Sequence, residues 1–504
     1  TDSTAQYNTA YGFTAMDAIT TGDSNVAIGY QSGGALNTGS SNTLIGGLAG
    51  DALTTGSFNV ALGKSALSTE DAHGKNVAIG YAALETQDAG ADAFNVAVGF
   101  NAGNAVTTGL YNTAVGGQAL LTNIDGDDNV AIGYNALKMF ESDTDGHGSN
   151  TAVGSSAMRD ATTGVNNTGI GQFAMGDGVV TGDENVAVGM HSMRNVTSTQ
   201  YSTALGAKAM GSGVTTGDYN IAVGYQAGKT LTSGGDNTII GALAGDALTT
   251  GVRNVAIGHN ALSTEDAGGY NVAIGYNALA TQDAGNAYNV AIGASAGTGI
   301  TSGVENTIMG GLAGNALTIG NHNVAIGFEA LTTSVDGDKN VAIGRRALKL
   351  YEDGDGNGHN TAVGSNSMEN TTTGEYNTAV GSQTASGGVM TGDYNVLMGY
   401  NAGHLISSGT YNILIGGLAG DAITTAEKNI AIGHGALGTE DTHGRNIAIG
   451  DSALLVLNAG AYGYNVAIGY EAGKAMSTGV QNIVVGSQAG DALTTGSGNV
   501  AIGF

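Results

Sequence analysis

The sequence predicts an all-β solenoid, in which one short unit winds repeatedly around a common axis. The pentapeptide Asn-Val-Ala-Ile-Gly and its close variants occur 29 times between residues 8 and 503. Twenty of the 28 spacings between copies are 17 residues, and the other eight are 18 to 21. With 88 glycines and no proline, this period excludes helix-pair repeats and collagen. We therefore expect about 29 stacked β-coils in a single continuous array over residues 1–504.

Each unit divides into a strand and a return path. In the unit that opens with Asn25, Val26 and Ile28 alternate with Ala27, which is the pattern of a strand with two different faces. We place Val26 and Ile28 inside the coil and Ala27 outside. Residues 35–36 supply a second short apolar stretch before a glycine corner. The recurring asparagine is expected to form a ladder of stacked amides along the array.

The third place of the motif suggests how the coils associate. It is Ala in 22 copies, and most exceptions are larger aliphatic residues: Leu44, Ile239, Ile308, Leu397, Leu414 and Val484. On the assignment above this row faces outward, and soluble proteins rarely leave such an apolar stripe bare. We expect two further copies of the chain to cover it in a homotrimer. The alternatives are that Ala faces inward and Val outward, or that an exposed stripe is tolerated.

Composition limits the partners of the chain. A net charge of −27 with only 15 Lys and Arg residues disfavours nucleic acid and anionic membrane surfaces. Cysteine is absent, and no apolar run is long enough for membrane insertion. The chain begins at Thr1 without the pattern of a signal peptide and ends directly after a repeat motif, so we expect it to be part of a longer protein.

The repeats resemble those of known surface fibres. The stretches at residues 220–228 and 53–56, which read Asn-Ile-Ala-Val-Gly-Tyr-Gln-Ala-Gly and Leu-Thr-Thr-Gly, resemble repeats of bacteriophage tail fibres and the head repeats of YadA-like trimeric autotransporter adhesins. The resemblance covers nearly the whole chain. It implies a homotrimeric β-solenoid in an extracellular or virion-surface location that binds a host surface receptor or glycan. The adhesin unit is shorter, and no neck, stalk or anchor is found, so fibre and adhesin both remain open.

Acidic insertions offer the best candidates for a metal. The run Asp-Gly-Asp-Gly-Asn-Gly at residues 353–358 begins like a calcium loop, but Gly364 stands where the bidentate Glu should be. A similar run lies near residue 143. The candidate calcium ligands are Asp353, Asp355, Asn357, Asp143 and Asp145. The alternative is a solvated acidic turn.

No pattern indicates an enzyme. Ser295 lies in a Gly-x-Ser-x-Gly match, but at a repeat corner with no helix after it. The pairs Glu70-Asp71, Glu265-Asp266 and Glu440-Asp441 are interpreted as acidic turns, because adjacent side chains usually point apart. The nine histidines, His73 among them, are scattered, so no zinc site is expected.

Three functions follow from this pattern. The first is a structural fibre shaft of a virion or cell surface, involved in attachment. The second is a self-assembling extracellular filament. The third is an ice-binding solenoid, because Thr-Thr-Gly recurs at one corner, at residues 107–109, 215–217 and 249–251.

Overall fold

A computed structural model describes residues 4–141, 147–352 and 357–504 and confirms an all-β solenoid with parallel strands. The chain divides into two units, Thr1–Arg253 and Asn254–Phe504. The continuity predicted across their junction stays a prediction. Among the described residues there is no helix, and hence none that could cross a membrane.

Every strand has three residues and lies directly after the first residue of a repeat. The first unit holds β1 Thr9–Tyr11, β2 Val26–Ile28, β3 Thr43–Ile45, β4 Val60–Leu62, β5 Val77–Ile79, β6 Val96–Val98, β7 Thr113–Val115, β8 Val130–Ile132, β9 Thr151–Val153, β10 Thr168–Ile170, β11 Val186–Val188, β12 Thr203–Leu205, β13 Ile221–Val223 and β14 Thr238–Ile240. The second unit holds β15 Val255–Ile257, β16 Val272–Ile274, β17 Val290–Ile292, β18 Thr307–Met309, β19 Val324–Ile326, β20 Val341–Ile343, β21 Thr361–Val363, β22 Thr378–Val380, β23 Val396–Met398, β24 Ile413–Ile415, β25 Ile430–Ile432, β26 Ile447–Ile449, β27 Val466–Ile468, β28 Ile483–Val485 and β29 Val500–Ile502.

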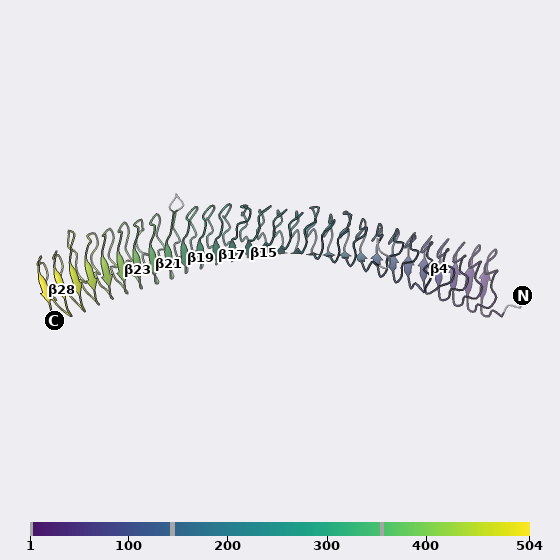
Figure 1. Cartoon of the computed structure of the whole chain (residues 1–504), viewed down its shortest axis with the longest axis horizontal. Coiled ribbons are helices and arrows are strands. Elements are labelled where there is room, and N and C mark those ends of the chain that lie inside the picture. The colour runs from purple at the N-terminus through teal and green to yellow at the C-terminus, as the bar shows by residue number, and fades with distance from the viewer. Residues whose placement is uncertain (1–3, 142–146, 353–356) are drawn as a thin grey trace. The chain divides into compact units, whose positions relative to one another are not determined.

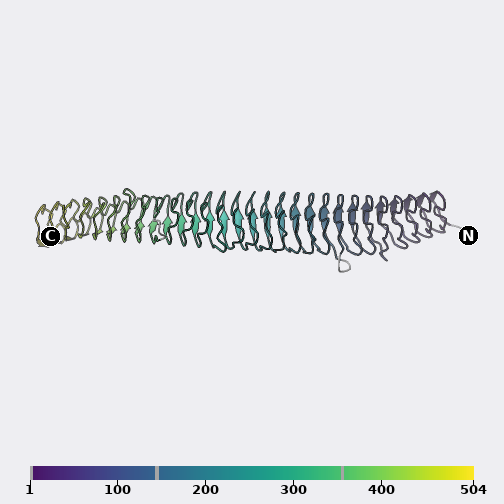
Figure 2. The same ribbon diagram turned by 90° about the horizontal axis from the view of Figure 1, so that it is seen from above.

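Consecutive strands within each unit pair in parallel and in register. Ala27 of β2 lies opposite Leu44 of β3, and Ala342 of β20 lies opposite Ala362 of β21. Figure 1 shows the resulting stack of coils in each unit, from purple to teal in the first and from green to yellow in the second. In Figure 2 the strands of a unit follow one another in one row. Each unit is therefore a stack in which a coil bonds to its sequence neighbours.

The inward face of the strand is the one that carries alanine. Ala27 is fully buried, whereas Val26 is half-buried and Ile28 is exposed. In every strand from β2 to β28 the middle residue is buried and the residues on either side are half-buried or exposed, so the prediction that Val and Ile fill the coil was wrong. The physical reason is the width of the coil: a single aliphatic side chain from the return path already fills the space beneath the strand.

That side chain explains the exceptions at the third place. Counting the asparagine as place one, a coil with Ala at place three carries Leu or Met at place nine in most cases, as Ala61 and Leu67 do. A coil with a large residue at place three carries Gly at place nine: a Cβ added to Gly50 would lie 2.9 Å from Cδ2 of Leu44. Places three and nine thus share one volume, as expected of a close-packed core.

The predicted asparagine ladder is present. The backbone N–H of Asn42 donates to Oδ1 of Asn25 at 2.9 Å, and its Nδ2 donates to the same oxygen at 3.0 Å. Nδ2 also donates to the carbonyl of Gly56, fourteen residues on, at 2.9 Å. Ser202, which replaces the asparagine in one coil, keeps part of the pattern because its Oγ accepts from the backbone N–H of Asn220 at 3.1 Å. The ladder satisfies backbone groups that the narrow core would otherwise leave unpaired.

The glycine that closes the motif is required by the stacking. Gly29 has φ +134°, and a Cβ there would lie 2.6 Å from the carbonyl of Gly46 in the next coil. A side chain at this place would therefore force successive coils apart.

Insertions lengthen a corner and leave the strands in register. Val130 of β8 still pairs with Thr151 of β9 although 21 residues separate them. The longer spacings thus lie between the strands, which keep the same register.

Candidate functional site

The outward side of the strands forms an apolar surface on each unit, which we call the β face. It consists of two rows, the second-place residues such as Val26 and Thr43 and the fourth-place residues such as Ile28 and Leu205. Leu205 is 47% exposed and Ile221 43% exposed. Exposed aliphatic rows of this length usually mark an interaction surface.

Aromatic rings flank the β face. The residue before the motif is often Tyr or Phe, and the rings of Tyr376, Tyr394 and Tyr411 lie 5.0 and 5.1 Å apart with interplanar angles of 4° and 6°. A second row, which includes Tyr81 and Phe100, follows the strands. Because stacked rings cover one another's faces, the rows present ring edges to solvent and offer few faces on which a sugar could stack.

A basic groove lies at one corner of the first unit. It has a volume of about 330 Å³ and is lined by Met190, His191, Arg194, Lys208, Gly211, Ser212, Gln226 and Lys229. Neither Lys208 nor Lys229 forms an ion pair with any described residue, whereas Arg194 is held by Asp177. Burial, and then the charges of Arg194 and Lys208, lower the pKa of His191. In a chain of net charge −27, this groove is a local concentration of positive charge and hydrogen-bond donors.

Three glutamates interrupt the core at the twelfth place of the repeat. The commonest residues there are Leu and Ile, such as Leu53, which is fully buried. Glu70, Glu265 and Glu440 occupy this place in three related coils and are also fully buried. Burial raises the pKa of each, and raises that of Glu440 to about 7. Carboxylates in such places need partners, since burying an ionised group without compensation is costly.

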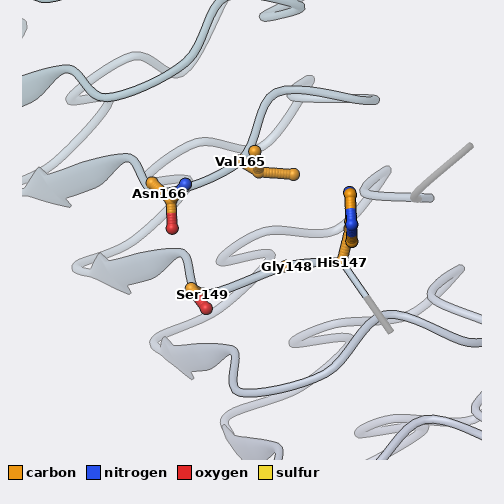
Figure 3. Close-up of a pocket in the computed structure, with 5 residues that line it drawn as sticks. All are labelled: His147, Gly148, Ser149, Val165 and Asn166. Atoms are coloured by element: carbon orange, nitrogen blue, oxygen red, sulfur yellow. The ribbon is translucent and has the colours of Figure 1, made fainter. Parts of the chain in front are cut away.

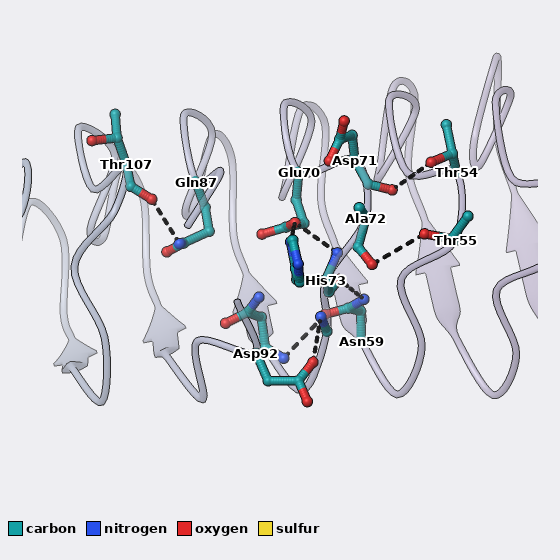
Figure 4. Close-up of polar contacts among 12 residues, drawn as sticks. Thr54, Thr55, Asn59, Glu70, Asp71, Ala72, His73, Gln87, Asp92 and Thr107 are labelled. Atoms are coloured by element: carbon teal, nitrogen blue, oxygen red, sulfur yellow. Dashed lines mark hydrogen bonds and ion pairs between the residues drawn. The ribbon is translucent and has the colours of Figure 1, made fainter. Parts of the chain in front are cut away.

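Around Glu70, three candidate ligands converge. The oxygens of Glu70 and Asp71 and the ring nitrogens of His73 include atoms that all lie within 4.8 Å of one another. Figure 4 shows the Glu70 carboxylate beside the His73 ring. Oε1 of Glu70 accepts a hydrogen bond from the backbone N–H of His73 at 3.0 Å, while Oε2 is buried and has no hydrogen-bond partner. The interpretation of these residues as a simple acidic turn missed this convergence.

The two related corners differ in their ligands. Glu265, Asp266 and Asp283 also converge within 4.8 Å, but Gly268 stands where His73 stands in the first corner. At the third corner the equivalents of Asp71 and His73 are Asp441 and His443.

The predicted calcium ligands Asp353, Asp355, Asp143 and Asp145 lie outside the described residues. Asn357 is exposed, and its carbonyl accepts a hydrogen bond from the hydroxyl of Tyr351 at 2.6 Å. A hollow of about 170 Å³ lies beside residues 147–149 and 165–166 (Figure 3). Of these five residues only His147 has a titratable side chain, so they do not form the nitrogen and sulfur ligand set of a zinc site.

The remaining sequence candidates have local partners. Ser295 lies in a turn after β17, and no hydrogen bond joins its side chain to a histidine or carboxylate among the described residues. At two of these corners one threonine donates to a carbonyl of the next coil: Oγ1 of Thr107 to Ile124 at 3.3 Å, and Oγ1 of Thr215 to Leu231 at 3.1 Å. These hydroxyls are therefore engaged within the fold.

No protein-family model matches the chain, and no curated protein matches it either.

Proposed function

We propose that the chain is a structural fibre shaft of a virion or cell surface, that it assembles as a homotrimer and that it takes part in attachment. The observation that carries this proposal is the β face, a largely apolar surface of half-buried to exposed side chains that recurs at every coil of each unit. A function spread over repeated coils suits a shaft better than a reaction, which needs groups that converge.

A second copy of the chain fits the β face better than an unrelated partner does. Parallel strands in a stack recur at about 4.8 Å, and only another array with the same period can match that spacing over many coils. Small and β-branched side chains such as Thr203 and Val223 leave room for close approach. The trimer first inferred from an outward alanine row thus rests instead on the Val, Thr and Ile rows that the β face presents.

The mass of the assembly in solution tests this association. We expect three chains per particle, and a lower mass for a variant with Leu205→Lys and Ile240→Lys, which places two charges on the β face of the first unit. The matched control is Val179→Lys with Val214→Lys, two exposed corner residues at 55% and 57% exposure. A monomeric wild-type chain, or equal dissociation of both variants, would refute the role of the β face. Particles that lengthen with protein concentration would favour the filament instead.

For attachment, the basic groove is the surface best suited to an anionic group such as the carboxylate or phosphate of a surface glycan. Lys208 and Lys229, which form no ion pair within the part of the chain that the structure describes, would supply the charge, and Gln226 would supply a neutral donor. Binding of acidic and neutral oligosaccharides to the full chain is the test. Lys208→Gln with Lys229→Gln should abolish any preference for the acidic ligand, while Lys64→Gln with Lys339→Gln, which changes the net charge equally, should not.

A further inference from the structure

We propose that Glu70, Asp71 and His73 form a binding site for one divalent transition-metal ion, with Zn²⁺ as its reference. The site lies at the corner of the coil that opens with Asn59, where the twelfth place of the repeat turns into the core. It does not depend on the proposed role as a fibre.

The geometry supplies three ligand atoms from one short turn. Candidate ligand atoms of the three side chains lie within 4.8 Å of one another, so small rotations bring them around one ion. Oε2 of Glu70 is buried without a hydrogen-bond partner, and so is Nδ1 of His73, which lies 3.8 Å from Oε1 of Glu70. Two polar atoms without hydrogen-bond partners at one buried corner are an arrangement that a cation would complete, with Nδ1 of His73 in its unprotonated form.

The backbone of the turn is already fixed. The carbonyl of Asp71 accepts from Oγ1 of Thr54 at 2.9 Å, and the carbonyl of His73 accepts from Nδ2 of Asn59 at 3.3 Å (Figure 4). Together with the bond from His73 N–H to Glu70, these contacts hold the ligands before any ion arrives. A site organised in advance loses little conformational entropy on binding.

The donor set selects the class of ion. One imidazole nitrogen and two carboxylate oxygens suit Zn²⁺ and its transition-metal neighbours, whereas Ca²⁺ takes oxygen ligands. Three protein ligands leave a fourth position for water, so the ion would be held at the edge of the core.

The next coil shows how a polar residue at the twelfth place is satisfied without an ion. Gln87 donates through Nε2 to the carbonyl of Thr107 at 2.8 Å, and its Oε1 accepts from Nδ2 of Asn95 at 2.6 Å. Both ends of this amide are therefore bonded. Glu70 has the same place in its coil but leaves one oxygen bare.

The third corner contains a natural contrast. Both oxygens of Glu440 are bonded, to the backbone N–H groups of His443 at 3.0 Å and Ala459 at 3.5 Å. Thr442 stands where the first corner has Ala72, and its hydroxyl lies 3.0 Å from Nδ1 of His443 and 3.1 Å from Oδ1 of Asp441. Asp441 and His443 are thus engaged by one threonine, and Glu440 is bonded at both oxygens, which is why we place the ion at the first corner and not at the third.

Equilibrium dialysis of the full chain against Zn²⁺ tests the site. We expect one tight ion per chain above weak surface binding, and at least a ~10-fold loss of affinity in His73→Gln. His443→Gln, the same change at the third corner, should bind as the wild type does. Ala72→Thr keeps all three ligands but introduces the competing hydroxyl, so it should also weaken binding.

Two further readouts separate ligand loss from misfolding. Thermal unfolding without metal should be similar for His73→Gln and His443→Gln, and only the wild type and His443→Gln should gain stability on adding Zn²⁺. Co²⁺ bound to the wild type should show ligand-field absorption that His73→Gln lacks. The proposal is overturned if the wild type holds no tight ion, or if His443→Gln loses it as fully as His73→Gln does.

Discussion

The buried Glu440 makes the stability of its coil depend on pH. Its side chain is fully buried at a place where the following coil has Leu457, and burial raises its pKa from 4.5 to about 7, while backbone N–H groups partly oppose the rise. Since the folded pKa exceeds the unfolded one, folding favours the neutral acid. Its contribution is complete below pH 4.5 and is lost as the pH rises through about 7.

A shift of that size corresponds to about 3 kcal/mol at most, and water near the corner reduces the expected effect to about 1–3 kcal/mol. Glu440→Gln keeps an acceptor for the backbone N–H of His443 and removes the titration. We expect the variant to match the wild type near pH 4.5 and to exceed it in stability near pH 8.

Amide hydrogen exchange over residues 429–446 measures the local free energy of opening, which suits an array that need not unfold in one step. Comparing the two proteins at each pH cancels the intrinsic dependence of exchange on pH. Glu184→Gln, a change at an exposed carboxylate, serves as the control. A difference between wild type and Glu440→Gln that stays constant from acid to alkaline pH would refute the reasoning.

Three further predictions concern the core and the corners. Ala61→Leu should destabilise its coil by about 1–3 kcal/mol because Leu67 fills the same volume, and adding Leu67→Gly should restore most of that stability. Urea unfolding measures both effects, and a double variant no more stable than Ala61→Leu would contradict the shared volume. Asn306→Ala should lower the free energy of unfolding by about 2–4 kcal/mol, since the carbonyl of Gly320 and the N–H of Asn323 lose their partner. Asn306→Ser should lower it less, and equal losses for the two variants would argue against the ladder. The chain should give no thermal hysteresis, because the hydroxyls of Thr107 and Thr215 donate within the fold and so interrupt a regular row of threonines that could order water; a clear freezing gap would support the ice-binding function instead.

The repeat itself made the fold predictable. Spacing alone located every strand, since each begins one residue after the motif asparagine or Ser202, and a recurring amide in a narrow coil has few partners other than its neighbours. The side of the strand that faces inward was not predictable from alternation, because Val26 and Ala27 are both apolar and a strand has two equivalent faces. The signal that could have decided it is the exchange between places three and nine, where Leu44 accompanies Gly50 and Ala61 accompanies Leu67.

The candidate metal site was less accessible to sequence reasoning. Adjacent Glu70 and Asp71 were expected to point apart, and His73 was treated as one of several scattered histidines. The shape of the corner brings Glu70, Asp71 and His73 together. Glu70 points into the core at a place that is often aliphatic in other coils, and the turn folds back so that the backbone N–H of His73 donates to the Glu70 carboxylate. The clue in the sequence was the replacement of Leu53 by Glu70 at the same place of consecutive units.

The constancy of strand register across corners of unequal length has a consequence for how such a chain can diversify. Because β8 and β9 pair as their neighbours do despite the additional residues between them, a corner can grow or change composition while the axial position of every other group in that unit stays where it was. Each unit thus keeps a constant axial spacing of its strands, while its corners can differ in length and chemistry. Selection could therefore alter the contacts of one corner without shifting the axial positions of the other coils in that unit.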